Sequence, residues 1–175
     1  MRLAVHRIEW IGLLLLGGAL SACWMRGGSE VHVIPEGFVG PVVIVFGVPG
    51  GESVDRGASG TLVFRIPRTG QLFVKGPHPK PGWYLRTYVV EAGNGTRLEL
   101  PHDTPTSPDP GRLQILGRSD GAALRDVGEI AFLSYYVGVP RQRHPGWGDQ
   151  VERLTDEAIQ EAAAVIESAG RIHSP

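Results

Sequence analysis

The chain has 175 residues, with 17 basic and 18 acidic side chains and a formal net charge of −1 at neutral pH. This near balance excludes the strongly basic surface that nucleic-acid binding needs, and it equally excludes a polybasic membrane-binding surface. Glycine and proline are frequent, at 25 and 14 residues, which favours a domain with many turns over a helical bundle.

The first 22 residues have the three regions of a secretory signal. Arg2 and Arg7 form a positive end, and an apolar run follows over residues 10–20. A run of this length suits a signal peptide but falls short of the ~20 residues that span a bilayer as a helix. We therefore expect residues 1–22 to be a cleaved signal peptide.

The end of this signal matches the bacterial lipobox, Leu20-Ser21-Ala22-Cys23. Small side chains at Ser21 and Ala22 let a signal peptidase hold the backbone closely, and the thiol of Cys23 accepts diacylglycerol before cleavage. Further acylation, for example by palmitate, would make the anchor durable, because two or more acyl chains bind a membrane stably. Cys23 is also the only cysteine, so no disulfide is expected. Residues 23–30 are predicted to be the lipidated cysteine and a short tether.

Residues 31–147 are predicted to form a β domain. Strands are expected at residues 31–34, 42–46, 61–66, 71–75, 83–90, 96–100, 113–116 and 129–137, and loops at residues 47–60 and 101–112. Residues 42–46 are five consecutive apolar residues rich in β-branching, which is typical of a strand buried on both faces. Turn residues 67–70 and 93–95 predict two hairpins, one joining residues 61–66 to 71–75 and one joining 83–90 to 96–100.

Residues 148–172 are predicted to form a helix packed on the β domain. Asp149 suits the N-cap and Gly170 suits the position after the last turn. Apolar residues recur at helical spacing from Val151 to Ala169 and form one stripe. The fold class expected is therefore mainly β, a small antiparallel β-sandwich with one C-terminal amphipathic helix.

No pattern in the chain indicates a catalytic residue, a cofactor or a metal site. The glycine-rich residues 47–51 lack the Gly-Lys-Ser/Thr ending of a phosphate loop, and the exported histidines lack the three-to-five-residue spacing of paired metal ligands. The one His/carboxylate cluster is His102 with Asp103 and Asp109. These three residues are the ones that an enzyme would use.

Another candidate patch lies between the last strand and the helix, formed by Arg141, Arg143, His144 and Trp147. An aromatic ring beside cations can bind an anionic or flat ligand, or a partner protein. A tryptophan in such a segment more commonly fills the junction between sheet and helix.

Residues 34–47, Ile-Pro-Glu-Gly-Phe-Val-Gly followed by a hydrophobic strand, resemble the opening of a bacterial family catalogued as domain of unknown function 6843. Members commonly begin with a lipobox and later carry an Ile-Pro-x-x-Gly turn, here residues 66–70. The resemblance covers residues 31–75 well and 129–138 loosely. It implies a β layout like that of transthyretin or immunoglobulin modules by analogy, and it implies no catalytic residue.

Together these features predict a cell-envelope lipoprotein held at a membrane by Cys23. We expect a non-catalytic module that binds a ligand or an envelope protein. Trp24 stands where an aspartate is associated with retention in the inner membrane, which favours the outer membrane, facing the periplasm. The alternatives are an envelope hydrolase and an assembly subunit that docks through its C-terminal helix.

Overall fold

A computed structural model gives the structure of the protein and describes residues 28–57, 59–78, 85–102, 111–140 and 146–172. Within these residues the chain forms nine strands and one helix. The strands are β1 (Ser29–Pro35), β2 (Gly40–Phe46), β3 (Asp55–Arg56), β4 (Leu62–Arg65), β5 (Gln71–Val74), β6 (Leu85–Glu91), β7 (Arg97–Leu100), β8 (Gln114–Arg125) and β9 (Gly128–Gly138). The helix is α2 (Trp147–Ile172).

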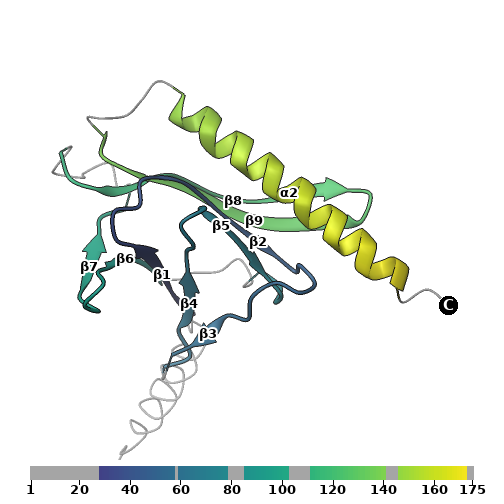
Figure 1. Ribbon diagram of the computed structural model, residues 1–175, viewed down its shortest axis with the longest axis horizontal. Helices are drawn as coiled ribbons and strands as arrows, with labels where there is room; N and C mark the ends of the chain where they lie inside the picture. Colours follow the sequence, from purple (N-terminus) through teal and green to yellow (C-terminus); the bar gives the residue numbers. More distant parts are fainter. Residues whose placement is uncertain (1–27, 58, 79–84, 103–110, 141–145, 173–175) are drawn as a thin grey trace, which may run out of the picture.

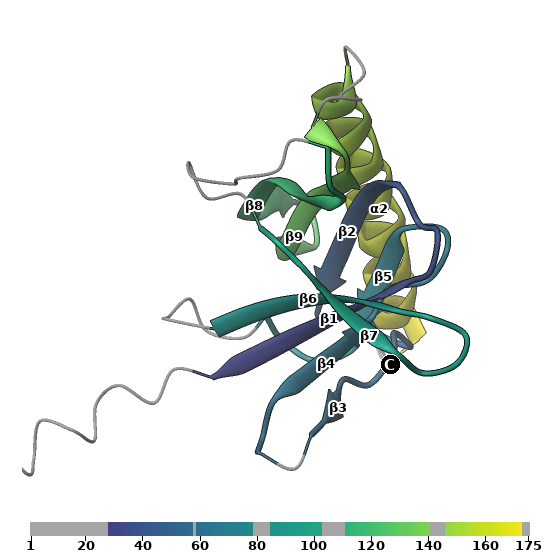
Figure 2. The ribbon, with the colours of Figure 1, turned by 90° about the vertical axis from the view of Figure 1, so that its left-hand side faces the viewer.

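These elements form three layers, with α2 lying across one sheet and a second sheet beneath it (Figure 1). The larger sheet, called sheet A here, has the strand order β3-β4-β1-β6-β7, and the smaller one, sheet B, has the order β5-β2-β9-β8. Figure 2 shows the two sheets as separate layers, with α2 behind sheet B. The predicted mainly β fold with one C-terminal helix is confirmed.

Strand β2 explains why sheet B is the middle layer. Its residues from Val42 to Val45 are completely buried. Side chains alternate between the faces of a strand, so Val42 and Ile44 belong to the core between the sheets, while Val43 and Val45 pack against α2. The expectation that this strand is buried on both faces is correct.

The prediction of an antiparallel sandwich is wrong, because both sheets are mixed. Strand β1 pairs in parallel with both β4 and β6, and β2 pairs in parallel with β5. The physical reason is that β1 and β2 are consecutive but lie in different sheets. The chain crosses from sheet A to sheet B at the turn that Gly37 makes with a positive φ of 74°. Strands β4 and β6 then add beside β1, and β5 adds beside β2, in the same direction.

The hairpin predicted between residues 61–66 and 71–75 is also wrong. Both segments form strands, but β4 lies in sheet A and β5 in sheet B. The turn between them carries the chain from one sheet to the other, and Gly70 docks it against β2 by accepting a hydrogen bond from the Val43 amide. A side chain at Gly70 would collide with the carbonyl oxygen of Pro41, so only glycine allows this approach.

The second predicted hairpin is confirmed by the antiparallel pairing of β6 with β7. In its turn, Gly95 has a positive φ of 81°, and the Thr96 amide donates a hydrogen bond to the Asn94 side chain. This is the local geometry that the Gly-Asn-Gly sequence favours.

The remaining differences are one strand that was not predicted and the ends of several elements. Strand β3 lies within the predicted loop of residues 47–60, and β1 begins at Ser29, inside the predicted tether of residues 23–30. Strand β8 continues to Arg125, well beyond the predicted residues 113–116, and pairs with β9 across an irregularity after Leu116. Helix α2 begins at Trp147, two residues before the predicted N-cap Asp149. Its apolar residues pack on sheet B, with Ala158, Ile159 and Ala162 at the centre of the contact.

Candidate functional site

The candidate site is a pocket of about 590 Å³ between the two sheets, at the end where β1 begins and β2 finishes. Its apolar lining comes from both sheets: Phe46 from the end of β2, Leu62 and Phe64 from β4, and Val54 from the segment before β3. Phe46 and Phe64 meet edge to face, with ring centroids 6.0 Å apart. The volume lies in the range of small-molecule sites.

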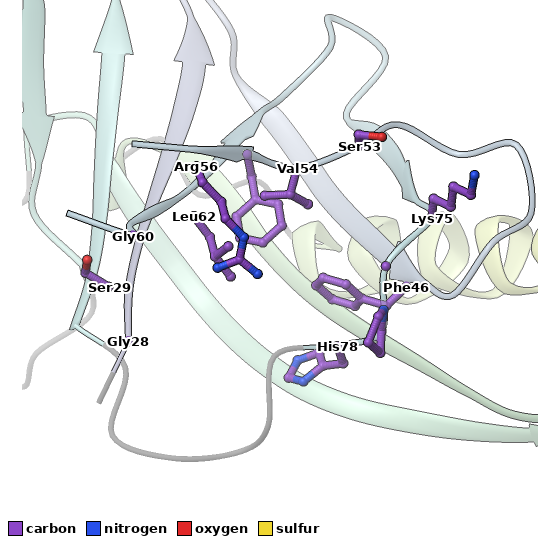
Figure 3. A pocket seen from close by; sticks show the side chains of 13 residues that line it. Gly28, Ser29, Phe46, Ser53, Val54, Arg56, Gly60, Leu62, Lys75 and His78 are labelled. Atoms are coloured by element: carbon purple, nitrogen blue, oxygen red, sulfur yellow. The ribbon is translucent and has the colours of Figure 1, made fainter. Parts of the chain in front are cut away.

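The polar lining of the pocket is basic. It includes Arg56, Lys75 and His78 and the hydroxyls of Ser29 and Ser53, and none of the described residues that line the pocket is acidic. Figure 3 shows the Arg56 guanidinium directed into the space above Leu62, while the Lys75 amine lies at the rim and points away from Arg56. The pocket therefore offers a cation above an apolar floor.

The local backbone explains the position of Arg56. Strand β3 pairs antiparallel with β4, and this pairing sets Arg56 opposite Leu62 and Asp55 opposite Val63. Successive side chains of a strand point to opposite faces. Asp55 lies 3.7 Å from Arg65, so the neighbouring carboxylate pairs with a different arginine. Within the described residues, Arg56 and Lys75 have no ion-pair partner.

His78 connects the pocket with a row of charges inside the sandwich. Its ring stands edge-on to Phe46 at 4.6 Å, and its Nε2 lies 4.0 Å from a carboxylate oxygen of Asp120. The side chain of His78 is 17% exposed, so it is held in place by these contacts and still reaches the pocket.

The charged row consists of His32, Glu30, Arg86 and Asp120. Arg86 donates from Nε to Glu30 and from Nη1 to Asp120, both at 2.7 Å. Glu30 and Arg86 are direct neighbours across the parallel β1–β6 pairing, whereas Asp120 comes from β8 of the other sheet. The row therefore joins sheet A to sheet B beside the pocket.

Burial changes the ionisation of the row. Burial by itself would raise the pKa of Glu30, but its contacts with His32 and Arg86 outweigh this and hold that pKa below its ordinary value. Burial lowers the pKa of His32, and the nearby Glu30 only partly opposes this. Glu30 is therefore ionised and His32 neutral near pH 7.

His32 is enclosed by aromatic rings. It contacts Phe64 and Tyr88, with ring centroids 5.1 and 4.9 Å away, and its Nδ1 lies 3.1 Å from the Tyr135 hydroxyl. Burial raises the pKa of both Tyr88 and Tyr135. The imidazole is 1% exposed, so it is enclosed in the core, at the end of the charged row that joins the two sheets.

Two buried polar atoms near this row, Nε2 of His32 and the hydroxyl of Tyr88, have no hydrogen-bond partner among the described residues. Buried polar atoms are usually paired. Among the described residues, these unpaired polar atoms therefore lie close to the buried Glu30–Arg86 pair.

Most of the predicted site residues lie outside the described part of the chain. This holds for Leu20, Ser21, Ala22 and Cys23 of the lipobox and for Arg141, Arg143 and His144 of the basic patch. Trp147 is described: it is the first residue of α2 and stands edge-on to Tyr136 at 5.9 Å. A side chain at Gly117 would collide with its ring, so Trp147 fills the junction between sheet and helix.

The predicted His/carboxylate cluster is only partly described. His102 forms a bridge with Ile115 at the edge of sheet B, whereas Asp103 and Asp109 lie outside the described residues. Over the ranges that the structure describes, no three His, Cys, Asp or Glu side chains gather closely enough to hold a metal ion. The same ranges contain no helix long and apolar enough to cross a membrane.

The pocket residues could not be singled out from the sequence. Arg56, Lys75 and His78 are isolated polar residues in segments that were predicted to be loops or strand ends. Glu30 and Arg86 stand 56 positions apart in the chain. His32 lies in the strand predicted at residues 31–34, but Glu30 falls in the predicted tether of residues 23–30, whereas β1 begins at Ser29 and includes it. The pattern therefore did not indicate that the two side chains share a face.

A solved structure shares this fold: a protein from Bacillus anthracis, described as a putative lipoprotein, matches with a TM-score of 0.58. The match covers 76% of this chain and 92% of that one, at 18% sequence identity. Identity this low shows the fold alone. No model of a known protein family matches the chain, and no curated protein matches it significantly.

Proposed function

We propose that this protein is an exported, lipid-anchored binding protein that holds a ligand in the pocket between its sheets, close to the membrane surface. The observation that carries the proposal is the position of the pocket. Gly28 and Ser29, at the start of β1, line it, and Cys23 of the lipobox comes five residues before Gly28. Five residues reach at most ~18 Å, so an acyl anchor on Cys23 keeps the pocket near the lipid headgroups.

Two observations support the anchor itself. The lipobox combines an apolar run of signal length with the only cysteine of the chain. The Bacillus anthracis protein that shares the fold is described as a putative lipoprotein. Attachment to the outer membrane, on its periplasmic side, and membership of the family catalogued as domain of unknown function 6843 are further parts of the proposal, and both rest on sequence patterns.

A binding role without catalysis agrees with the geometry of the site. The best-organised ionisable groups, Glu30 and His32, are 2% and 1% exposed and have no access to a substrate. His78 is the one histidine among the described residues that line the pocket, and its neighbour Asp120 is paired with Arg86. The described residues that line the pocket hold no carboxylate that could pair with His78 and a serine as a catalytic set.

The role as an assembly subunit docking through the helix has less support. Ala158 and Ala162 of the apolar stripe are already buried in the protein. They pack on sheet B of the same chain, together with the partly buried Leu154, Val165 and Ile166, so the stripe offers little area to another subunit.

The anchor is tested by changing Cys23 to serine and fractionating cells. The unchanged protein should sediment with membranes and carry acyl mass, whereas Cys23→Ser should be unprocessed and lack that mass. An unchanged protein without acyl mass would contradict the lipid anchor.

The pocket is tested separately by native mass spectrometry of the full chain extracted from membranes in a nonionic detergent. A bound small molecule should appear as an added mass, and filling the pocket by Val54→Trp or Leu62→Phe should remove it. Because either variant could perturb folding, its unfolding midpoint is compared with that of the unchanged protein. Retention of the added mass in both folded variants would exclude the pocket as the binding site.

A further inference from the structure

We infer that the ligand of this pocket is an amphipathic anion, with an apolar body on the floor formed by Phe46, Leu62 and Phe64 and a carboxylate or phosphate at Arg56. The inference rests on the proposed function, because it names the ligand class of the same pocket.

The balance of acidic and basic residues differs between the pocket and the rest of the chain. The whole chain has a net charge of −1, so a random patch of its surface holds acidic and basic residues in similar numbers. The described lining of the pocket instead holds Arg56, Lys75 and His78 and no acidic residue. A concave site lined by one sign of charge concentrates ligands of the opposite sign.

None of the described residues neutralises Arg56. Its neighbour Asp55 is turned to the other face of β3 and lies beside Arg65, which in turn lies 3.6 Å from Glu91. The guanidinium of Arg56 is directed into the pocket (Figure 3). A planar guanidinium with free donors matches a carboxylate or phosphate in a bidentate arrangement.

The floor of the pocket is apolar. Val54 and Leu62 are only partly buried and present apolar surface to the pocket near Arg56 (Figure 3). Phe64 and Phe46, which are 2% and 5% exposed, also line the pocket. A small inorganic anion would leave this surface in contact with water, whereas an alkyl or ring system would cover it. Lys75 stands at the rim, where it attracts the anionic group during entry.

The test uses native mass spectrometry of the full chain in a nonionic detergent, with ligands that share a twelve-carbon chain. Dodecanoate and dodecyl phosphate carry the proposed head, dodecanol is neutral, and dodecyltrimethylammonium is cationic. Both anions should bind at least ~10-fold more tightly than dodecanol, as expected for a charge-assisted contact, and the cation should bind more weakly still. Inorganic phosphate should not bind measurably.

Arg56→Gln should reduce the advantage of dodecyl phosphate over dodecanol to ~3-fold or less, and Lys75→Gln should have a smaller effect. The matched control is Arg153→Gln, which removes the same charge from the exposed face of α2, on the other side of sheet B. It should leave every affinity unchanged. A parallel series with dilauroylphosphatidylglycerol distinguishes a bilayer phospholipid from a free single-chain acid as the source of the anion.

The results distinguish an error in the ligand class from an error in the proposed binding function. If dodecanol binds as tightly as the anions, and Val54→Trp abolishes both, the pocket binds ligands but the anionic class is wrong. The same conclusion holds if Arg56→Gln has no more effect than Arg153→Gln. If no compound binds, or binding survives in the folded Val54→Trp and Leu62→Phe variants, the proposed function itself fails.

Discussion

The two faces of sheet B are built differently. The buried residues under α2 are small or aliphatic, centred on Val43 and Val45 of the sheet and Ala158 and Ala162 of the helix, and Phe73 and Phe132 are partly buried beside them. The face toward sheet A carries aliphatic residues together with the rings of Phe46 and Tyr135, and the charged row and the basic pocket lie beside it. On the helix face, apolar side chains of α2 and sheet B only have to fit together in shape. On the inner face, apolar packing is combined with buried charged side chains.

The difference lies in the buried charge of the inner face. Burying a charge is costly, and a well-packed apolar pair is commonly as stable as a buried ion pair or more so. The protein nevertheless keeps Glu30 and Arg86 inside, next to the pocket, and links them to Asp120 on the other sheet. We interpret the charged row as the element that fixes the spacing of the sheets at the pocket.

The largest effect is expected from Arg86→Met. It leaves the ionised Glu30 buried without its cation, and the loss of one partner of a buried pair costs about 3–5 kcal/mol. Urea unfolding measures the change. The matched control is Arg97→Met, since Arg97 lies at the same 2.7 Å from Glu91 but is 47% exposed, and its loss should cost less than ~1 kcal/mol. Equal effects of the two variants would mean that the buried Glu30–Arg86 pair contributes no more to stability than the exposed Glu91–Arg97 pair.

A comparable loss on the helix face should come from Ile159→Ala. Ile159 is 2% exposed, and truncating a buried isoleucine costs about 2–5 kcal/mol through lost burial and the remaining cavity. Ligand affinity should stay unchanged, because sheet B separates this residue from the pocket. A change in dodecyl phosphate binding in the folded variant would show that the two faces are coupled.

Acidification should weaken the inner face specifically. The folded protein holds His32 neutral with a lowered pKa, whereas the unfolded chain takes up a proton as the pH falls through 6.5, the ordinary pKa of histidine. The free energy of unfolding therefore keeps its full value above pH 6.5 as far as His32 is concerned. It falls toward lower pH by at most about 1.4 kcal/mol per pH unit for one histidine. Glu30 adds a loss of the same sign, beginning lower, near its ordinary pKa of 4.5.

Unfolding free energies measured from about pH 7 to about pH 5 should fall less steeply for His32→Gln than for the unchanged protein. The comparison of slopes holds even if the variant is less stable at every pH. Parallel slopes would show that His32 does not titrate differently in the folded and unfolded states.

The smallest effect is expected from Tyr88→Phe. The Tyr88 hydroxyl is buried without a hydrogen-bond partner among the described residues, so its removal relieves a desolvation penalty and should stabilise the protein by about 1 kcal/mol. Thermal and urea unfolding report the gain. A loss of stability would mean that the Tyr88 hydroxyl makes a hydrogen bond in solution.

The sequence alone determined the elements that local chemistry controls. The apolar run of β2 required burial on both faces, the Gly-Asn-Gly segment required the turn between β6 and β7, and the periodic stripe required an amphipathic α2. The prediction of an anchor at Cys23 likewise rests on a short contiguous pattern. In each case the residues that decide the outcome are neighbours in the chain.

Only the tertiary structure decided which strands share a sheet and which face points inward. Alternation in β1 would suggest that Val31 and Val33 face the core. Glu30 and His32 face it instead, because Glu30 accepts a hydrogen bond from Arg86 and His32 contacts the Tyr135 hydroxyl. In the same way, β4 and β5 have hairpin sequences but belong to different sheets. Alternation fixes the two faces of a strand but not its partner. The partners come from β6, β8 and β9, so the charged row and the pocket exist only once the sheets have packed.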